Sequence, residues 1–279
     1  MYDKSELMNY AIEGNVNMIN MLIPSSLVRS TNKHGFSALM YSAAYGHYQC
    51  VKALLIHEQG LKDNNGKTAL MHAASCYYDR DDAINEHIRR DYCNQGCNKV
   101  FTLIDHIKCV KFLIPFEKKT RDLTGKTALM HAACNGNPEI VKLLIRHEVG
   151  LQDRDNKTAL MYAAENGNNE CVISLMYKEA KKQDYEGMTA LMHAAKSGQF
   201  ECVETLIPHE AKLWDENGKT ALMHAAENGN IECVEILIHY EAKLLDKSGK
   251  TAIMYATENN YKECVKALSS YEEIMRIIY

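Results

Sequence analysis

The most regular feature of the chain is a pattern of polar and apolar residues that returns every 31 residues. Asp153, Asp184, Asp215 and Asp246 follow one another at this interval, and most of these residues begin an Asp-x-x-Gly stretch. Glycine tolerates a positive φ, so the stretch predicts a tight turn, and Asn156 replaces the glycine once. The pattern therefore predicts a series of similar local units.

Two helices are expected after each turn. A threonine such as Thr220 suits the N-cap of a short, alanine-rich first helix that stops at a Gly-Asn pair. We expect Asn230 to cap the second helix, whose apolar face includes Ile231, Val234 and Leu237. Neither helix can bury its apolar face alone, so neighbouring units must stack. The predicted fold is an all-α solenoid of helix-turn-helix units with short finger turns.

Eight such units are expected to form a single domain over residues 1–279. They start near residues 1, 32, 63, 122, 153, 184, 215 and 246. The third unit carries an insertion at about residues 77–104, where we expect two lengthened helices, at residues 77–92 and 100–114. The first unit is expected to cap one end of the array. A longer last helix is expected to cover the other end with the apolar residues Ile274, Met275, Ile277 and Ile278.

These features resemble the ankyrin-repeat family over essentially the whole chain. The matching elements are Asp-x-x-Gly-x-Thr, the leucine that follows, the Ala-Ala pair, the glycine before the second helix and the Val-x-x-Leu-Ile core. The Thr-Ala-Leu-Met form of the motif resembles the arrays of protists such as diplomonads. The resemblance implies an ankyrin-repeat solenoid that binds other proteins through the concave face of its finger turns and first helices.

Two departures from the family pattern change the contacts that the resemblance implies. The unit is two residues shorter than the usual length of about 33, and the shortage falls after the second helix, as at residues 241–244. We expect a tighter turn there, and the family's hydroxylated asparagine is absent. Methionine also replaces the family's histidine, so thioether packing is expected in place of hydrogen bonds between units. The methionines are Met71, Met130, Met161, Met192, Met223 and Met254.

Six cysteines share one repeat position beside the valine of the second helix. Equivalent atoms of stacked helices lie about 8–10 Å apart, whereas the Cα atoms of a disulfide lie within about 7 Å of each other. We therefore predict that these cysteines are buried thiols rather than a ladder of disulfides. They are Cys50, Cys109, Cys171, Cys202, Cys233 and Cys264.

Four histidines share another repeat position, at which three other units carry tyrosine. Adjacent repeats do not bring such residues to a single metal ion. The exchange with tyrosine indicates a packed side chain with one polar contact. The residues are His72, His131, His193 and His224, with Tyr41, Tyr162 and Tyr255 in the other units.

The insertion leaves one metal site open as an alternative. Cys93 and Cys97 are separated by three residues, and His87 and His106 lie nearby in the sequence. Together they offer four potential zinc ligands. The other interpretation is that the insertion only lengthens the two helices of its unit.

Composition and motifs argue against several classes of function. The net charge of −4 provides no basic field for nucleic acid or anionic lipid. No apolar run approaches the about 18–20 residues of a membrane span, and the N-terminus is polar, so we expect a cytoplasmic location. The chain has no Gly-rich phosphate loop, no Gly-x-Ser-x-Gly and no His-Glu-x-x-His. We therefore expect no catalysis and no cofactor.

The resemblance places partner contacts at three groups of positions: the two residues after the aspartate, the residue before the threonine, and the two residues after Ala-Ala. Regular units carry mostly Lys, Glu and Asn there, whereas Phe36, Tyr45, Tyr185 and Met188 are of types common at binding hot spots. The alternative is that these four residues fill local gaps in the packing. The predicted partner-binding residues are Phe36, Tyr45, Asn65, Lys67, Cys76, Lys126, Asn135, Arg154, Tyr185 and Met188.

Two functions are consistent with these patterns. The first is a non-catalytic, monomeric scaffold or adaptor that binds one or more proteins, with binding concentrated near the second and third units and the insertion. The second is a structural or cytoskeleton-associated spacer that self-associates through Ile274, Ile277 and Ile278 of its C-terminal helix. Neither function involves nucleic acid or a membrane.

Overall fold

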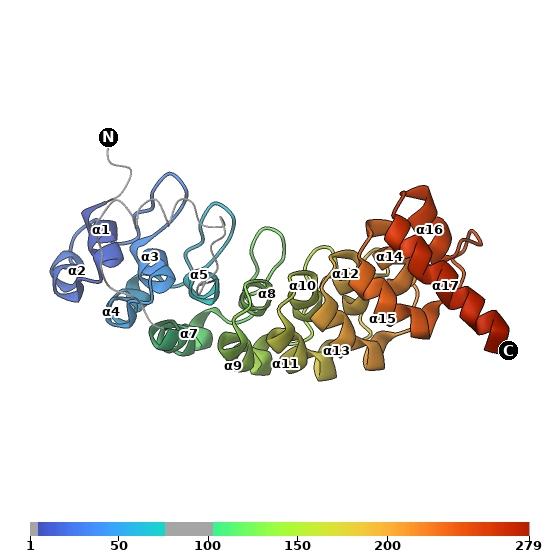
Figure 1. Ribbon diagram of the computed structural model, residues 1–279. Coiled ribbons are helices and arrows are strands. Elements are labelled where there is room, and N and C mark those ends of the chain that lie inside the picture. The colour runs from blue at the N-terminus through green and yellow to red at the C-terminus, as the bar shows by residue number, and fades with distance from the viewer. Residues whose placement is uncertain (1–4, 76–102, 279) are drawn as a thin grey trace. The chain divides into compact units, whose positions relative to one another are not determined.

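The computed structural model describes residues 5–75 and 103–278, and for residues 274–278 it describes only the course of the helix. All regular structure in these ranges is α-helical (Figure 1). The chain forms two compact units, which are described separately below. The first comprises Met1–Ala132 and Arg146–Glu148, and the second Ala133–Ile145 and Val149–Tyr279.

In the first unit, helices lie in two rows. The first helices of successive repeats, α1, α3 and α5, pack against one another, and α2, α4 and α7 form the second row. The bounds are α1 Glu6–Glu13, α2 Val16–Leu22, α3 Ala38–Ala44, α4 Tyr48–Glu58, α5 Ala69–Ala74 and α7 Leu103–Glu117.

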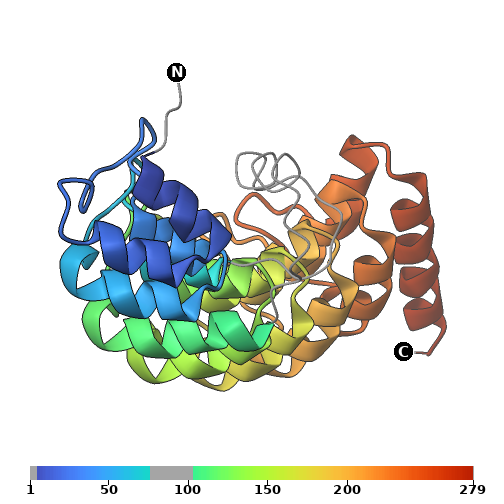
Figure 2. The same ribbon diagram turned by 90° about the vertical axis from the view of Figure 1, so that its left-hand side faces the viewer.

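The second unit repeats this arrangement with greater regularity. Helices α10, α12, α14 and α16 form one row and α11, α13, α15 and α17 the other, with neighbouring helices side by side (Figures 1 and 2). The bounds are α10 Ala159–Glu165, α11 Asn169–Glu179, α12 Ala190–Lys196, α13 Phe200–Glu210, α14 Ala221–Asn228, α15 Ile231–Glu241, α16 Ala252–Glu258 and α17 Lys262–Ile278. The pair α8 Ala128–Cys134 and α9 Pro138–Glu148 is divided between the two units.

The start of each first helix follows from its threonine. Thr158 has an extended backbone, and its hydroxyl accepts a hydrogen bond from the N–H of Met161 at 3.4 Å. Thr189, Thr220 and Thr251 occupy the same N-cap position. The threonine is therefore the N-cap residue of these helices, as predicted, although the side chains of Thr220 and Thr251 make no capping hydrogen bond.

The caps of the second helices differ from the prediction. Asn168 and Asn230 are at the N-cap positions, but their side chains do not cap the helices. The amide of Asn168 instead donates to the carbonyls of Ala133 and Cys134, both at 2.8 Å, at the end of the preceding first helix. Asn230 bonds the carbonyls of Ala195 and Lys196 in the same way. The asparagine therefore links successive repeats, because its NH2 group donates to helix-end carbonyls that have no acceptor role within their own helix.

The core confirms the predicted packing of sulfur-containing residues. The six cysteines of the second helices are buried thiols, and burial raises the pKa of Cys171 to about 12. Five of the six methionines are also buried, as predicted, and the sulfurs of Met161 and Met192 accept the N–H groups of Thr158 and Thr189 in their own repeats. Met254, in the last repeat, is the exception, with 48% of its surface exposed.

The chain leaves each second helix through a tight turn, as expected. In four repeats the residue two positions after the helix-ending glutamate has a positive φ, and it is Gly60, Lys119, Gly150 or Lys181. A hydrogen bond from the N–H of Leu213 to the carbonyl of Glu210 closes the same turn around Lys212, whose φ is 66°. Lysine at such a position is strained, since a Cβ disfavours positive φ.

We therefore expect Lys181→Gly to stabilise the protein by about 0.5–1 kcal/mol, because it relieves this strain and keeps the backbone N–H. Lys178→Gly is the matched control. It lies inside α11 and should destabilise by about 1 kcal/mol. Urea unfolding at neutral pH measures both changes. A loss of stability in Lys181→Gly would show that the lysine is not strained.

Two segments depart from the regular repeat. Helix α7 begins by Leu103, and the predicted start at Val100 and the predicted helix at residues 77–92 lie outside the described residues. Helix α17 continues past Glu272, whereas α9, α11, α13 and α15 end at the equivalent glutamate. The last helix is thus longer than its counterparts, as predicted. Among the described residues, no helix is long and apolar enough to cross a membrane.

Candidate functional site

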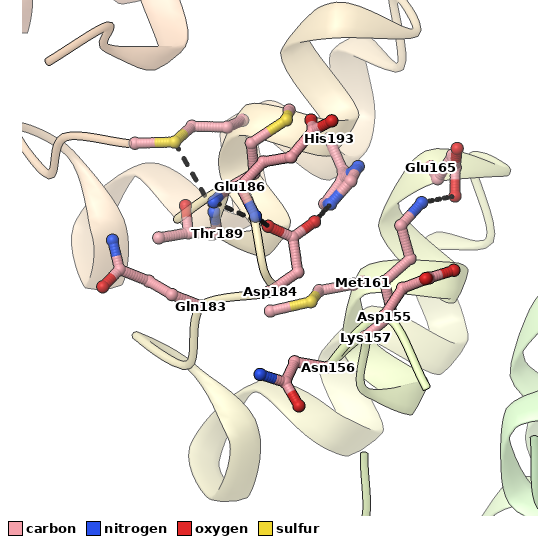
Figure 3. Close-up of polar contacts among 12 residues, drawn as sticks. Asp155, Asn156, Lys157, Met161, Glu165, Gln183, Asp184, Glu186, Thr189 and His193 are labelled. Carbon is pink, nitrogen blue, oxygen red and sulfur yellow. Dashed lines mark hydrogen bonds and ion pairs between the residues drawn. The ribbon is translucent and has the colours of Figure 1, made fainter. Parts of the chain in front are cut away.

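The aspartate that begins each repeat organises the finger turn. In the repeat of Figure 3, Asp184 Oδ1 accepts hydrogen bonds from the N–H groups of Glu186 at 3.0 Å and Met188 at 2.9 Å. Gly187 closes the turn with a φ of 76°. A Cβ at Gly187 would lie 2.6 Å from the backbone nitrogen of Glu216 in the next finger, so glycine suits this position for its small size as well as for its φ.

The second carboxylate oxygen binds the histidine or tyrosine of the first helix. His193 Nε2 lies 2.8 Å from Asp184 Oδ2 (Figure 3). His72 and Asp63 form the same contact at 3.0 Å. Where tyrosine replaces histidine, its hydroxyl binds the same oxygen, as in Tyr255. The predicted single polar contact of this position is therefore confirmed, and its partner is the turn aspartate nine residues earlier.

Burial and these contacts shift the pKa values of both groups. Burial lowers the pKa of His72 and outweighs the hydrogen bond to Asp63, which raises it. The pKa of His131 is lowered for the same reason. Burial alone would raise the pKa of Asp63, but hydrogen bonds from His72 and from the backbone of Lys67 and Asn65 lower it below its usual value. At neutral pH, therefore, a neutral imidazole donates to a charged carboxylate.

This arrangement predicts a loss of stability in mild acid. The folded state keeps His72 and His131 neutral, whereas the unfolded chain binds protons near pH 6.5. The free energy of unfolding should consequently fall as the pH drops below 6.5. The aspartates also contribute to the free energy of unfolding, and this contribution is lost only below about pH 3.8, because the pKa values of Asp63 and Asp122 are lowered.

The chain itself supplies a control, since tyrosine occupies the same position in three repeats. We expect the double variant His72→Tyr/His131→Tyr to lose less stability than the wild type between pH 7.5 and 5.5. Urea unfolding at the two pH values provides the comparison. An equal loss in both proteins would mean that these histidines do not cause the acid sensitivity.

A buried glutamate at the end of each second helix joins neighbouring repeats. Glu179 Oε2 accepts a hydrogen bond from the N–H of Leu160, in its own first helix, at 2.8 Å, and Oε1 accepts one from the N–H of Gly150, in the preceding turn, at 2.6 Å. Glu210 binds the N–H groups of Leu191 and Lys181 in the same way. We call these residues the clamp glutamates. They are Glu58, Glu117, Glu148, Glu179, Glu210 and Glu241.

The clamp glutamates are 1–2% exposed, so these recurring carboxylates lie in the interior and not in turns or on a solvated face. Burial raises the pKa of Glu179 and Glu241, and the backbone N–H donors oppose this rise. A signal was present in the sequence, because a glutamate recurs 26 residues after the repeat's first residue, as in Asp215 and Glu241. Its partners are backbone N–H groups, which leave no trace in the sequence.

An ion pair also recurs on the side of the repeats that carries the fingers and first helices. The lysine before the threonine forms an ion pair with the glutamate after Ala-Ala, as in Lys157–Glu165 at 3.0 Å (Figure 3) and Lys219–Glu227 at 2.8 Å. Both residues of each pair were assigned to the partner-facing surface from the family pattern. The short distances show that the finger base and the end of the first helix form one continuous face.

The structure separates the ten predicted partner-binding residues by exposure. Tyr45 and Met188 are 3% and 1% exposed, which fits packing rather than binding. The half-buried Phe36 ring lies 5.2 Å from Tyr41 and 4.6 Å from His72, so it too has a packing role. Lys67, Lys126 and Asn135 are half-buried, Asn65, Arg154 and Tyr185 are exposed, and Cys76 lies outside the described residues.

Of the four residues of the alternative metal site, the structure describes only His106. His106 is buried in α7, and its Nε2 lies 3.0 Å from the carbonyl oxygen of Ala44 at the end of the preceding first helix, a contact equivalent to that of Asn168 with Cys134. His87, Cys93 and Cys97 lie outside the described residues. Within the described part of the chain, no group of three His, Cys, Asp or Glu side chains could hold a metal ion. The side chains of Ile274, Met275, Ile277 and Ile278 also lie outside it.

Comparison with known proteins supports the repeat architecture. A search of curated proteins returns no significant match. A family model described as ankyrin repeats (3 copies) matches residues 7–86, 101–185, 137–217, 175–246 and 208–277, which together cover most of the chain. Together with the stacked helix pairs and finger turns, this match shows that the chain belongs to the ankyrin-repeat family.

Proposed function

We propose that the chain is a non-catalytic scaffold or adaptor that binds another protein through its finger turns and first helices. Ankyrin repeats are generally protein–protein interaction modules, which supports this class of function. Fold membership alone identifies no partner, so the proposal depends on the site.

One observation carries the proposal: the carboxylates that recur in the interior are engaged in holding the array together. The turn aspartates bind finger N–H groups and a histidine or tyrosine, and the clamp glutamates bind backbone N–H groups of two repeats. A catalytic site normally needs a distinct constellation of polar groups. The fingers and first-helix ends also carry exposed residues that differ from repeat to repeat, such as Tyr185 and Lys196.

The proposal can be tested by affinity capture from the native cell with two matched variants. The first changes exposed finger residues: Asn65→Arg, Arg154→Glu and Tyr185→Ala. The second makes the same charge changes on the second helices: Gln49→Arg, Lys178→Glu and Tyr177→Ala. All six residues are exposed.

We expect quantitative mass spectrometry to find proteins that the wild type and the second-helix variant retain and the finger variant loses. Loss in the second-helix variant alone would place binding on the opposite face and contradict the proposal. Equal thermal unfolding of the three proteins serves as the folding control.

A further inference from the structure

The repeat that begins at Asp184 keeps the framework of its neighbours and changes its surface. Its Asp184–His193 contact and its clamp residue Glu210 match those of the other repeats. Cys202 is buried as its counterparts are. Four of the positions that the family pattern assigns to partner contacts differ from both neighbouring repeats. Charged residues or asparagine in those repeats are replaced here by Tyr185, Met188, Lys196 and Ser197. The contacts that hold the repeat in the array are therefore kept, while three of the four changed residues, Tyr185, Lys196 and Ser197, are exposed.

Two repeated surface contacts are missing in this repeat. Elsewhere in the second unit, the residue before the threonine and the residue after Ala-Ala form a Lys–Glu ion pair, at 2.8 Å in Lys250–Glu258. Here these positions are Met188, which is buried, and Lys196. Asparagine after the glutamate bonds the first helix, as Asn228 does to the carbonyl of His224, whereas Ser197 replaces it here.

The exchange leaves an uncompensated positive charge. Each neighbouring repeat carries one lysine and one glutamate at the two positions, so their charges cancel. Lys196 is exposed and has no ion-pair partner among the described residues, and the glutamates of the adjacent repeats, Glu165 and Glu227, are paired with Lys157 and Lys219. The ammonium group of Lys196 can bind a carboxylate of another protein without breaking an ion pair within the chain.

The finger of the same repeat adds an aromatic contact. Tyr185 is 63% exposed, and its equivalents in the second unit are Arg154, Glu216 and Lys247. Exposed tyrosine offers a large apolar area with little loss of side-chain entropy on binding. Its backbone N–H bonds the carbonyl of Asp155 in the preceding finger at 3.1 Å, so the finger is held in place.

We propose that Lys196 and Tyr185 form a docking point for an acidic segment of a partner protein, with an aspartate or glutamate carboxylate on Lys196 and an apolar side chain on Tyr185. The inference rests on the proposed function, because it assigns a chemistry to the partner on the same face. It moves the proposed centre of binding from the second and third repeats to the repeat that begins at Asp184, because Phe36 and Tyr45 of the second repeat have packing roles.

A displayed library of random peptides tests the inference without knowledge of the natural partner. The library is selected at low salt on the full-length wild type and, in parallel, on Lys196→Glu. We expect peptides rich in Asp and Glu from the wild type and peptides rich in Lys and Arg from the variant. Synthetic peptides from the wild-type pool should bind Lys196→Glu about tenfold more weakly and should also weaken with salt.

Lys266→Glu is the matched control. Lys266 is exposed on α17, in the row of second helices, and its reversal changes the net charge equally. It should leave peptide affinity unchanged, whereas Tyr185→Ala should lower it. Thermal unfolding of each variant checks that the fold is preserved.

The outcomes distinguish the inference from the proposed function. Peptides that lose affinity in the three-residue finger variant but not in Lys196→Glu would overturn the inference and leave the proposed function standing. Pools of the same charge from both proteins, or no enriched peptide at all, would also overturn the inference. The capture experiment then decides the proposed function by itself.

Discussion

Replacing a clamp glutamate by alanine, as in Glu179→Ala, should destabilise the protein by about 2–5 kcal/mol. The carboxylate is 1% exposed and accepts the N–H groups of Gly150 and Leu160. Its loss would leave the buried N–H of Leu160 and the part-buried N–H of Gly150 without an acceptor, and a buried donor without a partner costs about 1–3 kcal/mol. Because one donor belongs to the preceding repeat, the variant should also loosen the junction between the two repeats.

Glu170→Ala is the control for this change. Glu170 is exposed in the first turn of the same helix, and its removal should cost about 0.3–1 kcal/mol through the helix dipole. Urea unfolding gives both values, and hydrogen exchange at Gly150 and Leu160 locates the effect. If the two variants lost similar stability, the clamp would contribute little to the array.

Replacing a turn aspartate, as in Asp184→Ala, should cost about 2–4 kcal/mol. The side chain accepts three hydrogen bonds, from the N–H groups of Glu186 and Met188 and from His193 Nε2. Hydrogen bonds to a charged group are stronger than neutral ones, and His193 would lose its partner in the interior. Asp155→Ala, which removes an exposed side chain from the preceding finger, should change stability by less than about 0.5 kcal/mol.

Another repeat of the chain suggests a second substitution that should compensate for the change of Asp184 to asparagine. In the second repeat, Asn32 replaces the aspartate: its Oδ1 accepts two finger N–H groups, and its amide donates to the hydroxyl of Tyr41 at 2.9 Å. The double variant Asp184→Asn/His193→Tyr reproduces this pair and should be more stable than Asp184→Asn. Denaturation curves that show no gain in the double variant would refute the coupling.

The sequence predicted the architecture because its signals are local. A threonine before an alanine-rich stretch marks the start of each first helix, and glycine or asparagine at the finger marks a positive φ, as Asn156 shows with a φ of 60°. The burial of the cysteines followed from repeat spacing alone. These features depend on residues close in the chain, so periodicity is enough to find them.

The clamp glutamates show what a periodic pattern leaves out. The donors to Glu179 lie 19 and 29 residues earlier in the chain and are backbone N–H groups of leucine and glycine. Only the stacking of repeats brings them to the carboxylate. The side chains of the asparagines before the second helices were misassigned for a similar reason, since their carbonyl partners belong to the preceding repeat.

The surface could be predicted only in part. The family pattern correctly placed Asn65, Arg154 and Tyr185 at exposed positions, but not Met188. A lysine at the finger base extends toward a glutamate at the end of the first helix, whereas an apolar side chain at the same position packs inward. Whether a side chain at this repeat position points outward or inward therefore depends on whether it is charged or apolar.

Site-specific photo-crosslinking at two exposed tyrosines tests the central claim most directly. Tyr185 lies on the finger of its repeat and is 63% exposed, and Tyr177 lies at the end of a second helix and is 79% exposed. A photoreactive residue is placed at one position or the other, and the protein is irradiated in its native cell. We expect covalent adducts with a partner protein from position 185 and few or none from position 177. Adducts from position 177 alone would contradict the central claim.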